Sequence, residues 1–534
     1  RRDDLETDGP PTASPPLWEG LRKARLLALL ASLAASASGA SAANISTWFA
    51  PSAAKIMRTA RPAGAPQEWD LAAARNEVES CQLVLSADEA VAGVKVTATP
   101  LEQEGGTGRL DPALFKVEYV PITRDKVPYP DPLPPLAGTF DLQPQQAQPV
   151  WISIRVPKGA APGAYRGTIT AQAGSWTRRL ALRLQVWKFT LPDTPACVTA
   201  FGNPVGSLAE WHGVPPGSPE SKSLDKKYYE FLLEHRISPM FIPADLMSPE
   251  AAAYLNDPRM TSYLIPYEEN DDKLKSLLAR LIEGNWFKKG YFYVVDEPVN
   301  KPAFDALVAV SDRLRQLEPR YRLVAPFWAR PDFDAHLRAT DLMLGRVNIW
   351  CPHLDYVESE PGIRQFLQNR RNAGDTVWWY VCNNPREPRN NLQIDQNAMA
   401  HRTLPWQQKR EGFQGLLYWS VCAWNKSIIK DPWENMDTLG TGFYGDGSLV
   451  YPGRKVGVDG PVSSQRLEVF RDGLEDYDYL ALADQLLGPE VTAGYVAKIA
   501  RSLTDYERDP QKLEPVRGEL GAALEKATAT PRPD

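Results

Sequence analysis

The sequence predicts a multidomain fold of the β plus α/β class, in which an N-terminal β-sandwich precedes a (β/α)8 TIM-like barrel. The chain has 534 residues, more than a typical single domain contains. In its first third, apolar and polar residues alternate in short runs, as they do in half-buried strands. Farther along, apolar strand-like runs alternate with amphipathic helix-like runs, which is typical of α/β folds.

Residues 1–43 are interpreted as a disordered leader followed by a secretory signal peptide. Arg22, Lys23 and Arg25 precede an apolar run, and the small residues at 40–42 provide a cleavage site. The run is too short to span a bilayer, and no other segment holds about 18 uninterrupted apolar residues. We therefore expect a secreted protein, extracellular or periplasmic, with no transmembrane segment.

Residues 44–190 are predicted to form the β-sandwich. Runs such as "SCQLVLSA", "FKVEYVPI" and "RRLALRLQVWKF" alternate with a period of two and are separated by Pro and Gly turn signals. The Pro-rich stretch 129–149 is expected to be a long loop, either packed over the next domain or serving as a plain crossover. No catalytic group of residues is visible in this region.

Residues 191–490 are predicted to form the barrel. Eight apolar runs supply candidate strands, at 197–202, 238–243, 262–266, 291–297, 322–327, 345–352, 376–382 and 415–421. Amphipathic runs between them supply helices, and the run at 463–487 supplies the last one. Residues 491–534 are expected to add a C-terminal helical tail.

The composition favours a carbohydrate ligand over nucleic acid. The formal net charge of −6 gives no basic footprint for a polyanion. The chain has 16 tryptophans, and tryptophan in clefts commonly stacks on sugar rings. Its 5 cysteines and 5 histidines show no CxxC, HxH or HExxH spacing, so we expect no metal and no other cofactor. The charge, the composition and these spacings do not predict an oligomeric state.

Asp296 and Glu297 close the fourth candidate strand, "YFYVVDE". That position is the carboxyl end of a barrel strand, where barrel enzymes place their chemistry. The alternative is that Asp296 caps the following helix, with Pro298 in its first turn. The helical pattern begins nearer Lys301, which leaves both acids in the loop and favours a catalytic role.

The adjacency of the two acids indicates a particular reaction. Glycosidases usually place two carboxylates about 5 Å or more apart on either side of the scissile bond. Neighbouring residues can hardly straddle a sugar in that way. They suit a substrate-assisted reaction, in which one acid protonates the leaving oxygen and the other orients a 2-acetamido group that attacks the anomeric carbon. The pair therefore points to a glycan substrate that carries an N-acetylhexosamine.

Aromatic and amide side chains at the ends of later strands are candidates for binding the sugar. Apolar walls enclose an acetamido methyl group and stack on the sugar, while Tyr and Asn bind hydroxyls. The candidates are Trp350, Trp378, Tyr380, Asn383, Trp419, Trp424 and Asn425. Because strand residues alternate faces, Trp378 and Tyr380 share one side and Trp379 the other. For each Trp, core packing is the alternative interpretation.

Five motifs occur in order along the chain: "YPDPLPPL", "VPKGAAPGAYRGTIT", "YVVDEP", "GLLYWSV" and "GDGSLVYPG". Together with the helix that begins near Gln465, they resemble glycoside hydrolase family 123 and its wider group of relatives. The resemblance implies a β-sandwich joined to a (β/α)8 barrel. It also implies hydrolysis of terminal β-linked N-acetylgalactosamine with retention, with Asp296 orienting the acetamido group and Glu297 acting as acid and base.

The C-terminal motifs have a structural interpretation as well. In the helix near Gln465, a set of charged residues is available for ion pairs that fix it to the barrel: Arg466, Arg471, Asp472, Glu475 and Asp476. The loop "GDGSLVYPG" follows the last strand, so Asp446 and Tyr451 are within possible reach of the substrate.

Two other functions remain open. A glycosidase of another sugar specificity would need a nucleophile from a later strand end, and few acids are found there: Asp355, Glu358, Glu387, Asp431 and Glu434. A non-catalytic glycan-binding protein on a barrel scaffold would be favoured if Glu297 capped a helix or were buried in an ion pair. The acid pair itself fits both the galacto and the gluco epimer.

Overall fold

The computed structural model describes residues 43–62, 64, 68–122, 124, 126–203, 208–328, 338–437 and 439–529. Apart from Ala43, the predicted leader and signal peptide lie outside the described residues, so secretion stays a prediction. Within the described ranges, no helix is long and apolar enough to cross a membrane.

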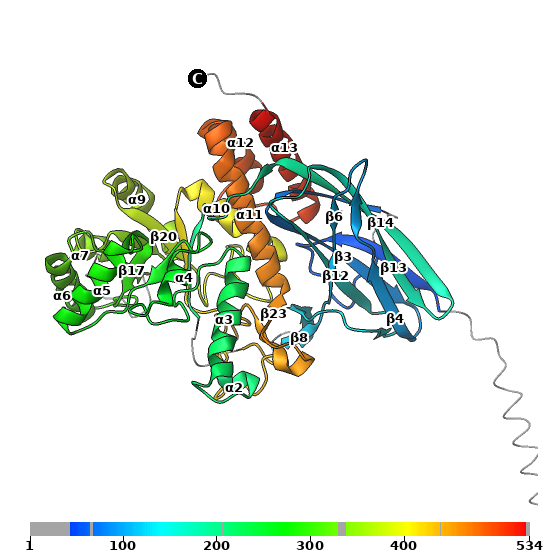
Figure 1. The fold of residues 1–534 in the computed structure, drawn as a ribbon, viewed down its shortest axis with the longest axis horizontal. Coiled ribbons are helices and arrows are strands. Elements are labelled where there is room, and N and C mark those ends of the chain that lie inside the picture. The colour runs from blue at the N-terminus through cyan, green and yellow to red at the C-terminus, as the bar shows by residue number, and fades with distance from the viewer. Residues whose placement is uncertain are drawn as a thin grey trace, which may run out of the picture. The chain divides into compact units, whose positions relative to one another are not determined.

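The N-terminal region consists of two β-sheets on one hydrophobic core (Figure 1). One sheet has the order β1(Ile45–Pro51), β3(Glu77–Ala87), β12(Ala147–Val156), β7(Ala113–Lys116). The other has the order β11(Phe140–Leu142), β4(Val91–Ala98), β13(Gly163–Ala173), β14(Trp176–Thr190), β2(Glu68–Arg75), with β5(Leu101–Gln103) and β6(Arg109–Leu110) beside it. Leu83 and Val150 of the first sheet share a fully buried core with Ile169 and Leu182 of the second. The predicted β-rich region is confirmed.

The stretch 129–149 is more than a plain crossover. It contains β10(Pro132–Leu133), which pairs with β23(Pro461–Ser464) directly before the long C-terminal helix. The preceding strands β8(Tyr119–Ile122) and β9(Val127–Pro130) form a hairpin. Of the two interpretations of this stretch, packing against the following region is therefore the correct one.

The second region is a barrel-like sheet of parallel strands. The order is β15(Val198–Phe201), β21(Gly415–Tyr418), β20(Thr376–Tyr380), β19(Ile349–Pro352), β18(Leu323–Phe327), β17(Gly290–Tyr293), β16(Tyr263–Leu264). The chain at 238–240 connects the two ends: the Met240 N–H donates to the Phe201 carbonyl at 2.8 Å, and the Leu264 N–H donates to the Met240 carbonyl at 2.8 Å. The barrel-like fold is confirmed.

The predicted eight-strand count is not reached within the described ranges. The candidate strand at 238–243 makes only an isolated bridge, between Pro239 and Phe201. Pro239 has no N–H to donate to a neighbouring strand, which limits regular pairing at this position. The other seven candidate strands exist, but they are shorter than predicted; the fourth ends at Tyr293, not at Glu297.

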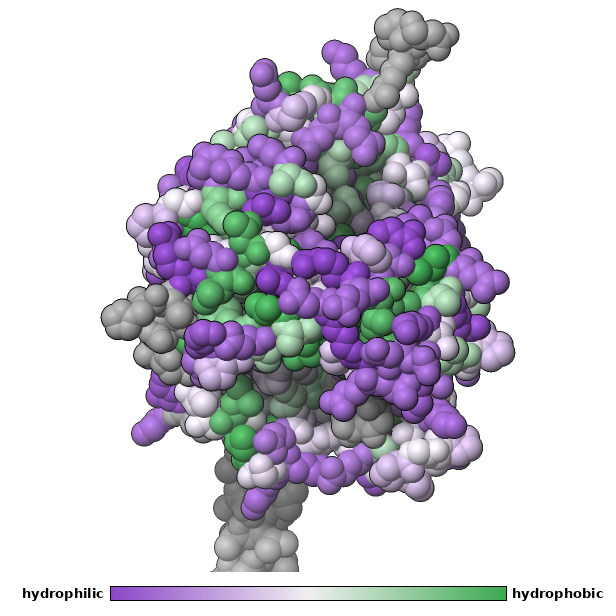
Figure 2. All heavy atoms as spheres, turned by 90° about the vertical axis from the view of Figure 1, so that its left-hand side faces the viewer, coloured by the Kyte–Doolittle hydropathy of each residue, from purple (hydrophilic) through white to green (hydrophobic). Residues whose placement is uncertain are grey.

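Helices follow most strands (Figure 1). They are α2(Ala209–His212), α3(Pro219–Glu234), α4(Ala251–Leu255), α5(Asp271–Glu283), α6(Lys301–Leu317), α7(Ala339–Met343), α8(Leu354–Ser359), α9(Ile363–Asn372) and α10(Ala398–Glu411), with 3-10 turns η1(Phe287–Lys289) and η2(Gly453–Val456). Helix α5 illustrates why they form: the Asn270 side chain accepts from the Lys273 N–H at 3.0 Å as an N-cap, and Leu274, Leu277, Leu278 and Leu281 form its buried stripe. The face that carries α5 and α6 is mainly polar, with small apolar patches (Figure 2).

The C-terminal part begins with β22(Tyr451–Pro452) and β23, followed by α11(Gln465–Leu486), α12(Pro489–Ile499) and α13(Pro510–Ala529). Helix α11 contacts both α10 and the sandwich strand β3 (Figure 1). Its charged residues form the predicted ion pairs: Arg402 of α10 binds Asp476 at 2.6 Å, and Arg466 binds Asp131 at 2.9 Å with both side chains fully buried. These pairs join α11 to the barrel and also to the N-terminal region.

Candidate active site

The site is built on the loop that follows β17. Asp296 and Glu297 lie three and four residues beyond the strand end, with Asp296 exposed and Glu297 half-buried. The carboxyl ends of parallel strands meet at one end of a barrel, so this loop lies at the same end as those that follow β20 and β21.

The capping interpretation of Asp296 is excluded by the helix that follows. The N-cap of α6 is Asn300, whose side chain accepts from the Ala303 N–H at 3.1 Å. Glu297 instead has a positive φ of 40°, a left-handed conformation that costs free energy for a residue with a side chain. Such strain persists where the surroundings fix it, and here it orients the Glu297 side chain toward β20.

Two tyrosine hydroxyls hold the two acids. The Tyr293 hydroxyl donates to Asp296 Oδ1 at 2.5 Å, and the Tyr380 hydroxyl donates to Glu297 Oε1. Burial, reinforced by the carboxylate beside each ring, raises the pKa of both phenols well above the ordinary value. Both hydroxyls therefore stay protonated at neutral pH and act as neutral hydrogen-bond donors.

Behind Tyr380 lies a neutral histidine. The ring of His353 stacks on Trp328 at 4.6 Å and meets Tyr380 edge-on at 4.9 Å. Its Nδ1 accepts from the Asp355 N–H at 3.2 Å, which leaves Nε2–H to donate to the Asn384 carbonyl at 3.0 Å. Burial is the main cause that lowers the pKa of His353, to about 4. An uncharged ring thus fixes the plane of the tyrosine that contacts Glu297.

A second carboxylate faces the same end of the barrel. Asp446 accepts from Trp419 Nε1 at 3.1 Å and from the Tyr418 hydroxyl at 3.4 Å. Burial raises the pKa of Asp446 to about 6. Burial also raises the pKa of the Cys382 thiol to about 12, and the charges of Asp446 and Glu297 add to that rise.

The predicted sugar-binding residues separate into those near the acids and those elsewhere. Tyr380 contacts Glu297, and Trp419, with 37% of its surface exposed, is bound to Asp446. Asn383 lies in the loop after β20, where its Oδ1 accepts from the neighbouring Cys382 Sγ at 3.3 Å. These three share the loops that follow β20 and β21 with Asp446.

Trp350 and Trp378 require correction. Trp350 is fully buried on the outer side of the sheet, where it meets Phe366 of α9 edge-on at 4.9 Å. Trp378 does share the interior face with Tyr380, as the alternation predicted, but it lies one layer deeper and is fully buried against Tyr291 at 5.1 Å. Both are core residues with no surface to offer a substrate.

Trp424 and Asn425 also have structural contacts. Trp424 is 6% exposed and packs edge-on against Trp211 of α2 at 5.9 Å. Asn425 accepts from the Ser427 N–H at 3.0 Å and so closes a turn. Tyr451, considered for substrate contact, donates to Asp131 at 2.6 Å in the fully buried ion-pair cluster. Trp424 and Tyr451 are therefore corrected to structural roles, whereas the exposed Asn425 stays a prediction.

The acids that could have served as a separate nucleophile are engaged elsewhere. Ion pairs hold Asp355 with Arg389 at 3.0 Å, Glu358 with Arg364 at 2.8 Å, and both Asp431 and Glu434 with Lys455 at 2.6 and 3.2 Å. The exposed Glu387 accepts from the Asn397 N–H at 3.3 Å. None of these contacts brings a second carboxylate to Glu297.

Three residues at the site were not among the sequence candidates: Tyr293, His353 and Trp328. Tyr293 belongs to the strand that carries the acids and precedes Asp296 by three residues, a spacing that a search for donors next to the acids would detect. His353 and Trp328 follow β19 and β18, at the same end of the barrel as the acids. Their position directly after predicted barrel strands could have identified them as site candidates from the sequence.

Two family models match the chain. The model described as glycoside hydrolase 123, catalytic domain, matches residues 207–483, and the glycoside hydrolase 123 N-terminal domain matches residues 55–173. The catalytic-domain match spans the loop of Asp296 and Glu297 and the loop of Asp446. No curated protein sequence matches the chain.

Among solved structures, a family 123 glycoside hydrolase from Clostridium perfringens has the same fold. It aligns with a TM-score of 0.67 at 13% identity and covers 90% of this chain and 98% of the other. A β-glucuronidase from Parabacteroides merdae aligns with a TM-score of 0.28 at 11% identity, covering 70% of this chain and 48% of the other. The second similarity is too weak to bear on fold or function.

Proposed function

Because the chain belongs to glycoside hydrolase family 123, we propose that it removes terminal β-linked N-acetylhexosamine from glycans, with N-acetylgalactosamine as the preferred sugar. The proposed reaction is retaining and substrate-assisted. The observation that carries the proposal is the adjacent pair Asp296 and Glu297 at the end of β17, with a separate tyrosine donor for each carboxyl group.

In the first step, Glu297 donates its proton to the glycosidic oxygen as the bond from that oxygen to the anomeric carbon breaks. The carbonyl oxygen of the substrate's 2-acetamido group forms a new bond to the anomeric carbon from the opposite face and gives an oxazolinium ion. Asp296 accepts the hydrogen bond of the acetamido N–H and stabilises the positive charge that develops there. The aglycone leaves as an alcohol.

In the second step, Glu297 takes a proton from water, and the water oxygen attacks the anomeric carbon. The bond to the acetamido oxygen breaks, and the group returns to its amide form. Two inversions at one carbon give net retention. A residue that donates a proton in one step and accepts another in the next needs a fixed position, and the hydrogen bond from the Tyr380 hydroxyl supplies it.

Trp419 is proposed to stack on the sugar ring, with the buried Asp446 holding its indole in place. The exposed Trp419 indole offers a flat apolar face, and its N–H is held by Asp446 at 3.1 Å, so the ring orientation is set before substrate arrives.

The direct test is the release of a fluorogenic aglycone from the β-N-acetylgalactosaminide and the β-N-acetylglucosaminide. We expect turnover by wild type, faster on the galactosaminide, and a fall of about 10² to 10⁴ in kcat for Glu297→Gln and Asp296→Asn. Both substitutions are nearly isosteric, so the thermal unfolding temperature serves as the control for folding.

Turnover that survives in both variants would assign the reaction to other residues. A folded wild type that hydrolyses neither sugar would contradict the N-acetylhexosamine specificity and favour a glycosidase of another specificity or a glycan-binding protein. The N-terminal stretch 1–43 further motivates the proposal that the protein is secreted, which detection of the processed chain outside the cytoplasm would test.

A further inference from the structure

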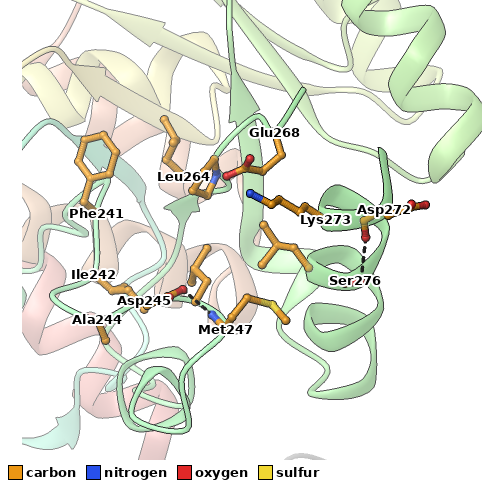
Figure 3. Close-up of a pocket in the computed structure, with 13 residues that line it drawn as sticks. Phe241, Ile242, Ala244, Asp245, Met247, Leu264, Glu268, Asp272, Lys273 and Ser276 are labelled. Atoms are coloured by element: carbon orange, nitrogen blue, oxygen red, sulfur yellow. Dashed lines mark hydrogen bonds between the residues drawn. The ribbon is translucent and has the colours of Figure 1, made fainter. Parts of the chain in front are cut away.

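A pocket of about 540 Å³ opens on the rim of the barrel (Figure 3). It lies between the segment after Met240 and the segment after β16, with the first turns of α5 as its third wall. Its lining residues are Phe241, Ile242, Ala244, Asp245, Leu246, Met247, Leu264, Pro266, Glu268, Asp272, Lys273, Ser276 and Leu277. Eight of these thirteen residues are apolar.

The pocket exposes large apolar side chains to solvent. Phe241 is 42% exposed and Met247 is 48% exposed, whereas Ile242, Leu246 and Leu277 beneath them are below 9%. Two exposed large hydrophobic residues over an apolar floor form a concave surface of the kind that binds ligands. In Figure 3 the Glu268 carboxylate and the Lys273 ammonium group point toward the middle of the pocket, Asp272 points away from it, and the Asp245 carboxylate lies beside Met247.

Hydrogen bonds hold the walls in place. The Asn203 amide group clamps Phe241 from both sides: Nδ2 donates to its carbonyl at 3.0 Å, and Oδ1 accepts from its N–H at 2.9 Å. Arg280 of α5 donates through Nε to the Leu246 carbonyl at 2.8 Å. Asp245 accepts from the Met247 N–H at 2.8 Å. A preformed pocket loses little conformational entropy when it binds.

The pocket adjoins the candidate active site. Leu264 lines the pocket and pairs with Tyr291 of β17, the strand that leads to the acids. Its side chain packs on the same interior cluster as Tyr293, whose hydroxyl contacts Asp296. The pocket is therefore lined by the segments that follow residues 238–240 and β16, and Asp296 and Glu297 follow β17, the next strand in the sheet.

We propose that this pocket is a subsite for the aglycone and that it binds an alkyl chain attached to the scissile oxygen. The proposal rests on the proposed function. An enzyme that removes a terminal sugar holds only that sugar in the barrel mouth, so the part of the substrate that extends over the rim is the leaving group. The exposed Phe241 and Met247 side chains, over an apolar floor of Ile242, Leu246 and Leu277, fit a flexible alkyl chain.

Binding can be tested without catalysis by methyl NMR of the full chain labelled with [methyl-13C]methionine. The Met247 resonance is assigned by its loss in Met247→Ser. We expect 1-octanol to shift this resonance in a saturable manner, methanol to leave it in place, and the fully buried Met399 to respond to neither. No saturable shift at Met247 would overturn the proposal whatever the enzyme's activity.

The role in catalysis is tested by the ratio of kcat/KM for n-octyl and methyl β-N-acetylgalactosaminide. We expect wild type to favour the octyl glycoside by about tenfold, and Met247→Ser and Phe241→Ser each to remove most of that preference. The matched control is Val491→Ser on α12. Val491 and Met247 are each 48% exposed, so this variant removes an equally exposed apolar side chain outside the pocket and should keep the ratio.

Two results separate the two proposals. An octyl preference that survives in both pocket variants would overturn the aglycone subsite while leaving the proposed function intact. If wild type turns over neither glycoside, the proposed function is contradicted. If octanol still gives a saturable shift in that case, the pocket binds an alkyl ligand but is not an aglycone subsite.

Discussion

The chain uses carboxylates in two contrasting ways. Along α11, fully buried acids are bound by arginine: Asp131 by Arg466 at 2.9 Å and Asp476 by Arg402 at 2.6 Å. At the barrel mouth, the more accessible Asp296 and Glu297 receive hydrogen bonds from tyrosine hydroxyls.

The two kinds of partner differ in how they affect the gain and loss of a proton by the carboxyl group. Arginine keeps its charge at all accessible pH values, so an acid bound to it always has a charged partner and serves as an anchor. Burial alone would raise the pKa of Glu468, but Arg471 and His235 outweigh it and hold that pKa well below its usual range. A tyrosine donor is neutral and supports a carboxyl group without fixing its charge. The acids around α11 are thus suited to holding the structure together, and Glu297 at the mouth is suited to the proton transfer proposed for it.

The largest expected effect is on stability. Arg466→Met leaves Asp131 buried without its bidentate partner, because Arg466 donates from both Nε and Nη2 to that carboxylate. We expect the free energy of unfolding to fall by about 3–5 kcal/mol, as measured by urea denaturation.

The control for that variant is Arg501→Met. Arg501 pairs with Asp505 at 2.7 Å, but the two side chains are 44% and 59% exposed. Exposed pairs contribute little, so we expect a small fraction of the Arg466 effect. Equal losses in the two variants would remove the distinction between buried anchors and surface pairs.

His353 provides a test of the neutral environment behind Tyr380. Its pKa is about 4 in the folded chain against about 6.5 when unfolded, so between these values the unfolded chain binds more protons and stability falls as pH falls. This one group lowers the free energy of unfolding by about 2 kcal/mol between pH 7 and pH 5. Between pH 7 and pH 5, the free energy of unfolding of the His353→Gln variant should therefore fall by about 2 kcal/mol less than that of wild type, whatever the stability of the variant at pH 7. Parallel pH profiles for the two proteins would show that His353 titrates normally.

Tyr380→Phe gives the smallest expected effect. It removes one hydroxyl that donates to Glu297 and keeps the buried ring between His353 and the barrel interior. A hydrogen bond to a charged group contributes about 1.5–3 kcal/mol, and the lower end of that range corresponds to a fall in kcat of about tenfold. Trp379→Phe is the matched control: its ring lies on the outer face and donates to Gln408 at 3.0 Å, and it should leave kcat unchanged. Unchanged kcat in Tyr380→Phe would deny the tyrosine a role in positioning Glu297.

The acid pair was predictable because its signal is local. A strand of aromatic and β-branched residues that ends in two acids places them at the carboxyl end of a barrel strand, and Asn300 begins the next helix. Residue partners are less local: Tyr380 meets Glu297 across 83 positions of sequence. The ion pairs of α11 were predictable from helical spacing, but their partners on the N-terminal region, such as Asp131, were not.

The tryptophans show a second limit. Alternation correctly grouped Trp378 with Tyr380 and separated Trp379, because strand residues point to opposite faces. It does not say how deep a residue lies along the barrel axis, and Trp378 lies one layer below the mouth. For Trp350, the sequence of a single strand does not indicate which face of that strand packs against the helices.

The central claim, that the substrate's own acetamido group attacks the anomeric carbon, is tested most directly by fluorination of that group. Fluorine withdraws electrons from the acetamido carbonyl oxygen and weakens it as a nucleophile. We predict that kcat/KM falls stepwise from the acetyl to the monofluoroacetyl, difluoroacetyl and trifluoroacetyl substrates. A value of kcat/KM that does not change along this series would contradict the account, because a nucleophile supplied by the protein would not respond to fluorine on the acetamido group.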